Sequence, residues 1–139
     1  MYWLNAQHVP APTDHQMYLE NSWRIHKERI VDMGLRGFEF DEKSMMYVGR
    51  RTKNMPASVL ANHYSISRYG EERAVLMFRK DLSRKIEARD ARVLTKLGEI
   101  WKYGLKLACH NSSGYCHSMI ILNAVNYCSS RPEFERYFQ

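Results

Sequence analysis

Apolar residues recur at helical spacing along most of this chain. Leu19, Trp23, His26, Ile30 and Met33 follow one another at intervals of three and four residues, which predicts an amphipathic helix that ends near residue 34. The same spacing predicts helices over about residues 71–82, 87–103 and 116–127. Residues 132–139 contain a proline and many charges, so they are expected to form a surface tail.

Two short apolar runs interrupt the helical pattern. Residues 45–49 (MMYVG) and 105–109 (LKLAC) are typical of buried strands. Strands separated by helices favour a parallel pair with a right-handed crossover. The sequence therefore predicts one α/β domain over its 139 residues, with a helical N-terminal extension at about 1–36 and an α/β part at about 45–128.

In such folds ligands bind beyond the carboxyl ends of the strands. Two predicted loops leave those ends, at residues 49–67 and 110–115. If the strands are neighbours, the loops bring one set of residues to a single crevice: Gly49, Arg50, Asn62, His63, Cys109, Cys116 and His117.

The segment from Cys109 to His117 carries the densest set of reactive side chains. A strand, a turn with Ser113, and a helix that opens at Cys116 form a layout typical of anion binding, because the first backbone N–H groups of a helix lack partners. The same helix end would favour a Cys116 thiolate and a neutral His117. The alternative is that both cysteines are core residues. A zinc site is disfavoured, because adjacent Cys-His pairs do not point at one tetrahedral centre.

Basic residues are concentrated in the middle of the chain. The net charge is +6, and residues 46–95 carry 11 basic and 5 acidic side chains. On one continuous helix Lys85, Arg89, Arg92 and Lys96 would form a stripe able to follow a nucleic-acid backbone. The alternative is the ordinary solvated face of a helix.

Other features concern the setting of the protein. An odd number of cysteines, three, without an export signal indicates reduced thiols and a cytoplasmic location. No run approaches the roughly 20 apolar residues that cross a bilayer, so no membrane partner is expected.

Several motifs in order resemble an uncharacterised bacterial and phage family of domains of unknown function. They are Val48-Gly49-Arg50, then 58–62 (SVLAN), then a helix, then Cys109 and Cys116-His117, and they span about residues 47–127. The chain departs from the family pattern at His63, Glu71, Asn111 and Ser118. The resemblance implies a small Rossmann-like domain with a short parallel sheet flanked by helices, and a phage accessory protein.

Two functions follow as hypotheses. The first is a protein that handles a nucleotide, a nucleoside or another phosphate-bearing small molecule, as a hydrolase or transferase without a cofactor or metal. His117 and Cys116 would be catalytic, and the ligand would be bound by Gly49, Arg50, Asn62, His63, Cys109 and Ser113. The alternative is a non-enzymatic inhibitor or binding protein that acts on a host protein or a nucleic acid. The oligomeric state does not follow from the sequence.

Overall fold

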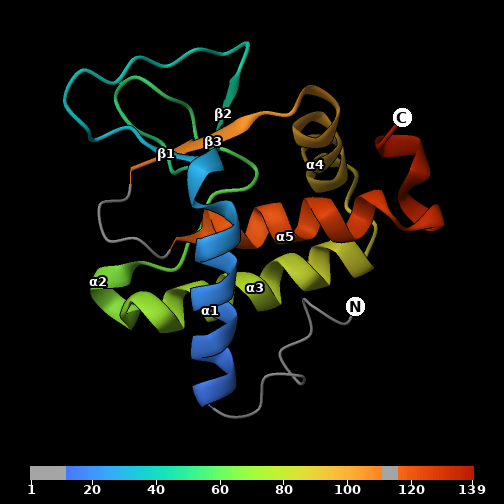
Figure 1. Cartoon of the computed structure of the whole chain (residues 1–139), viewed down its shortest axis with the longest axis horizontal. Coiled ribbons are helices and arrows are strands. Elements are labelled where there is room, and N and C mark those ends of the chain that lie inside the picture. Colours follow the sequence, from blue (N-terminus) through green and yellow to red (C-terminus); the bar gives the residue numbers. More distant parts are fainter. Residues whose placement is uncertain (1–11, 111–115) are drawn as a thin grey trace.

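The computed structural model describes residues 12–110 and 116–139, with side chains from residue 17 onward (Figure 1). Its elements in chain order are α1 (Pro12–His26), η2 (Lys27–Arg29), β1 (Ile30–Asp32), β2 (Met45–Tyr47), α2 (Ile66–Tyr69), α3 (Glu71–Glu87), α4 (Ala91–Tyr103), β3 (Lys106–Cys109), α5 (His117–Ser129) and η3 (Pro132–Tyr137). Within this described part, three strands form one parallel sheet in the order β1-β3-β2. The prediction of an α/β fold with a short parallel sheet is therefore confirmed.

Strand β1 corrects the prediction for the N-terminal part. The predicted helix is wrong beyond His26, because the chain turns through η2 and residues Ile30–Asp32 pair with β3. Ile30 and Val31 are β-branched, which favours extended backbone, and β3 offers them an open edge. The spacing of Ile30 and Met33 fitted a helix, although Ile30 begins β1 and Met33 lies in the turn that follows it. Residues 1–11 of the predicted extension lie outside the described residues.

The sheet register brings the carboxyl ends of its strands to one edge. Asp32 is opposite Cys109, and Tyr47 is opposite Ala108, so β1, β2 and β3 end at nearly the same level. The backbone of Val48 continues this pairing by donating a hydrogen bond to the Ala108 carbonyl (3.0 Å). Loops that leave this edge therefore begin side by side.

Helix α5 is the centre of the core. It packs against α1, α3 and α4, and Figure 1 shows it running between the sheet and α3. Its buried residues lie on nearly all sides: Ser118, Met119, Ile120, Ile121, Leu122, Ala124, Val125 and Cys128. A helix that is apolar all round is typical of such a buried position. The core thus holds the start of α5 rigidly beside the sheet edge.

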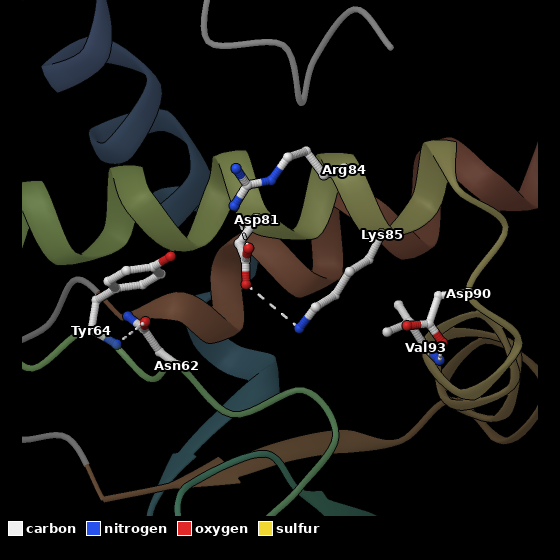
Figure 2. A network of polar contacts seen from close by, with 7 residues as sticks. All are labelled: Asn62, Tyr64, Asp81, Arg84, Lys85, Asp90 and Val93. Atoms are coloured by element: carbon white, nitrogen blue, oxygen red, sulfur yellow. Dashed lines mark hydrogen bonds and ion pairs between the residues drawn. The ribbon is translucent and has the colours of Figure 1, made fainter.

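The chain breaks between α3 and α4 later than the sequence pattern predicted. Helix α3 runs to Glu87, and α4 starts at Ala91 after Asp90. The Asp90 carboxylate accepts hydrogen bonds from the backbone N–H group of Arg92 (3.0 Å) and from that of Val93 (3.4 Å; Figure 2). Arg89 has φ of 59°, a left-handed conformation that no continuous helix contains. An N-cap and a reversed backbone thus separate the two helices.

The predicted surface tail at residues 132–139 is wrong. Residues 132–137 form η3, in which Phe134 is 1% exposed and joins the core. Gly98 of α4 allows this packing, because a Cβ atom there would collide with the Tyr137 carbonyl. One aromatic side chain and one glycine therefore bind the C-terminal segment to the domain. No helix among the described residues is both long and apolar enough to cross a membrane.

Candidate active site

A pocket of about 390 Å³ lies at the carboxyl edge of the sheet. Residues from the end of β2, the loop after it, the end of β3 and the start of α5 line it. Six of the predicted site residues are among them: Gly49, Arg50, Asn62, Cys109, Cys116 and His117. Residues 60 positions apart in the chain thus meet because β2 and β3 are paired and parallel.

Arg50 is held at the pocket by its own backbone and by the following loop. Its Nε donates a hydrogen bond to the Asn62 carbonyl (2.7 Å), and its carbonyl accepts one from the Tyr47 hydroxyl. Its side chain remains exposed. A guanidinium has five N–H donors, so the bond from Nε leaves the terminal nitrogens to approach an anion.

Asn62 positions the loop rather than only facing the pocket (Figure 2). Its Oδ1 accepts a hydrogen bond from the Tyr64 backbone N–H (2.9 Å), and its Nδ2 donates to the Ala74 carbonyl in α3 (3.2 Å). Both ends of the amide are thus engaged with backbone. The role that the structure supports for Asn62 is to join the loop to α3, while contact with a ligand stays a prediction.

His117 lies in the first turn of α5, against the end of β2. Its Nε2 lies 2.7 Å from the Val48 carbonyl, to which only a protonated ring nitrogen can donate. The Phe78 ring packs against it edge to face, at 5.0 Å between centroids. Burial lowers the pKa of His117, and the nearby Arg50 charge lowers it further. The ring is therefore neutral near pH 7, with Nδ1 as its acceptor atom.

Cys109 and Cys116 lie together in the wall of the pocket. Their sulfur atoms are 3.8 Å apart, and both residues are buried free cysteines. The Ser118 hydroxyl donates to the Cys109 sulfur (3.5 Å). The pKa of the Cys109 thiol is raised, first by its hydrogen bond with Cys116 and then by burial. Cys109 is therefore the thiol that keeps its proton, and the predicted Cys116 thiolate stays a prediction.

Of the two remaining predicted ligand-binding residues, only His63 belongs to the part of the chain that the structure describes. His63 is exposed and is not among the lining residues. Ser113 lies outside the described residues.

The predicted basic stripe is wrong as a feature of one helix. Lys85 belongs to α3 and forms an ion pair with Asp81 (3.5 Å; Figure 2), whereas Arg92 and Lys96 belong to α4. Arg89 lies in the turn between them, and its guanidinium covers the Phe134 ring at 4.8 Å. Because the helix is interrupted after Glu87, Arg92 and Lys96 on α4 do not continue the helix face of Lys85 on α3.

The sequence reasoning missed several residues of the pocket wall. They include Tyr47, Tyr64, Ser65, Ile66, Val75 and His110. Tyr47 and Val75 belong to a strand and a helix that were predicted, so their periodicity could have placed them near the sheet edge. Ser65 and Ile66 gave no such signal, because they sit in a loop and in the short helix α2. Among the side chains that the structure describes, in residues 17–110 and 116–139, no three of His, Cys, Asp or Glu are grouped as metal ligands.

A comparison with known protein families matches residues 36–127 to a family described as Domain of unknown function (DUF4326). The match covers about two thirds of the chain, including β2, β3, the helices between them and nearly all of α5. It confirms the predicted resemblance to a family of domains of unknown function. No curated protein and no solved structure matches the chain.

Proposed function

As this chain belongs to the DUF4326 family of domains of unknown function, we propose its function from the pocket itself: it binds a phosphate-bearing small molecule of the nucleotide or nucleoside class. The observation that carries the proposal is the position of Arg50 at the rim of this pocket, which also includes the start of α5. The volume of about 390 Å³ falls in the range of small-molecule sites.

Two groups would hold the phosphate. The Arg50 guanidinium can form a bidentate pair with phosphate oxygens. Cys116 is the N-cap of α5, with no side-chain cap hydrogen bond among the described residues, and the N-terminal end of a helix attracts an anion. Tyr64 and Ile66 supply an apolar wall of the pocket, against which a base or sugar would pack.

The catalytic roles proposed for His117 and Cys116 follow from their protonation. A neutral His117 whose Nε2–H is held by Val48 has Nδ1 available as a general base for a hydrolase or transferase. Cys116 is the candidate nucleophile, with the helix end favouring its thiolate. We also propose that the domain is Rossmann-like, since it combines a parallel sheet with a pocket at its carboxyl edge.

The test is the melting temperature with a panel of inorganic phosphate, nucleosides and nucleoside mono-, di- and triphosphates. A ligand at 100 times its Kd adds about 2.7 kcal/mol to the free energy of unfolding, which raises Tm by several degrees in a chain of this length. Arg50→Ala should abolish the shift caused by phosphate-bearing ligands. Arg92→Ala is the matched control, because Arg92 is exposed on α4 and does not line the pocket.

The outcomes separate the functions. A rise in Tm with nucleotides that Arg50→Ala removes supports the proposal. A rise in Tm with nucleosides alone would mean that the base or sugar is recognised by the apolar wall of the pocket and that Arg50 does not bind phosphate. No shift with any member of the panel would overturn it. That result would favour the phage-type binding protein, whose partner is a host protein or a nucleic acid. We propose a cytoplasmic setting, supported by three free cysteines that a reducing compartment maintains.

A further inference from the structure

The two sulfur atoms in the pocket wall are close enough to react with each other. Cys109 ends β3, and Cys116 precedes α5, so two separate elements of the core hold them. Their sulfurs are 3.8 Å apart, whereas a disulfide bond is about 2.05 Å long. An approach of the two sulfur atoms by about 1.8 Å would therefore join them.

Both thiols can be reached from the pocket even though they are buried. They are 3% and 5% exposed, and both line the pocket. A reagent as small as hydrogen peroxide can enter a hollow of about 390 Å³. Cys128 differs in each respect, since it is 0% exposed, lies in α5 and does not line the pocket. Burial raises the pKa of Cys128 to about 12.

We infer that Cys109 and Cys116 form a reversible redox pair, which peroxides oxidise to an intramolecular disulfide across the pocket wall. In the first step the Cys116 sulfur attacks one peroxide oxygen, the O–O bond breaks, and a Cys116 sulfenic acid and water form. In the second step the Cys109 sulfur attacks the Cys116 sulfur and releases a second water. Two thiols thus lose two electrons and two protons, and one peroxide is reduced to two waters.

The surroundings of the pair assign the order of these steps. Cys116 lies at the start of a helix, where the thiolate that attacks peroxide is favoured. Its hydrogen bond with Cys116 and its burial raise the pKa of the Cys109 thiol, so Cys109 retains its proton and takes the resolving role. The bond would fasten β3 to α5 beside His117, so oxidation would alter the pocket. The inference goes beyond the proposed function and does not depend on any ligand.

The test is a count of free thiols in the intact protein before and after treatment with hydrogen peroxide. The samples are quenched, unfolded and alkylated with N-ethylmaleimide, and the number of added groups is read from the intact mass. The reduced protein should add three groups, one for each cysteine. The oxidised protein should add one, and dithiothreitol should restore three.

Chymotrypsin identifies the bridge. Cleavage after Tyr115 and Tyr127 places Cys109, Cys116 and Cys128 on separate peptides, so a disulfide links two peptides of known mass. Cys128→Ser should still form the bridge at the wild-type rate, whereas Cys116→Ser should add two maleimides before and after peroxide. Mapping of the wild-type chain decides the question even if a variant fails to fold.

Three results would overturn the inference. The folded wild-type chain could keep three free thiols after peroxide, or the bridge could include Cys128. Alternatively, the bridge could form only in urea and not in the folded protein. None of these results bears on nucleotide binding, which is measured separately by the melting temperature.

Discussion

The close contact between Gly49 and Tyr47 allows a quantitative prediction about the pocket. Gly49 is buried and lies two residues after the end of β2. A Cβ atom at this position would lie 2.5 Å from the Tyr47 hydroxyl oxygen, 2.7 Å from Cζ and 2.9 Å from Cε1. Real Cβ atoms do not approach other atoms so closely, so Gly49→Ala must displace the Tyr47 ring. The displacement would also break the hydrogen bond from the Tyr47 hydroxyl to the Arg50 carbonyl.

The cost has two parts. Overpacking of a buried position costs about 1–3 kcal/mol, and the lost hydrogen bond adds about 0.5–1.5 kcal/mol. Gly49→Ala should therefore lower the free energy of unfolding by about 1.5–4.5 kcal/mol. Because all three crowded atoms belong to the outer part of one side chain, Tyr47→Leu removes them together.

The assay is urea unfolding of the wild type, the two single variants and the double variant. In the Tyr47→Leu background, Gly49→Ala should cost close to nothing, and the coupling energy should be at least about 1 kcal/mol. If the losses of stability in the two single variants instead sum to that of the double variant within about 0.5 kcal/mol, steric crowding between Gly49 and Tyr47 does not explain the effect of Gly49→Ala. The same four proteins, tested for Tm shifts with nucleotides, would show whether displaced Tyr47 also disturbs Arg50.

Three further predictions concern the C-terminal segment and His117. Gly98→Ala should lower the free energy of unfolding by about 1–3 kcal/mol and expose residues 132–139 to trypsin, because its Cβ would collide with the Tyr137 carbonyl. An unchanged rate of proteolysis would contradict this packing. Phe134→Ala should lower the free energy of unfolding, measured in urea, by about 3–5 kcal/mol, and Phe134→Leu should lower it much less. Equal stability of the wild type and Phe134→Ala would contradict the burial of Phe134 in the core. Burial lowers the pKa of His117, so below its ordinary pKa of about 6.5 the unfolded chain binds more protons and stability falls as the pH falls. Urea midpoints at about pH 7.5 and about pH 5.5 should differ less in His117→Gln, which does not titrate and keeps an N–H donor for Val48; an identical pH dependence would refute the buried neutral ring.

Local patterns were sufficient for the elements that carry a long apolar face or consist almost entirely of apolar residues. The apolar face of α3, the strand at 106–109 and the buried helix after Cys116 all followed from spacing and composition. The paired parallel strands then placed Arg50, Cys109 and His117 around one pocket. Topology made this possible, because parallel strands end at a common edge and the motif residues follow those ends.

At other positions the sequence pattern was compatible with more than one structure, and tertiary contacts determined which one forms. Ile30 fits both a helix face and a strand, and the open edge of β3 selected the strand. The sequence pattern predicted Phe134 as part of a polar tail. In the structure Phe134 is buried, and Gly98, which has no side chain, lets the C-terminal segment pack against α4. The 3.8 Å between Cys109 and Cys116 likewise depends on how α5 is seated against the sheet. Spacing along a chain specifies which residues share a face, but the partner of that face is set by elements distant in sequence.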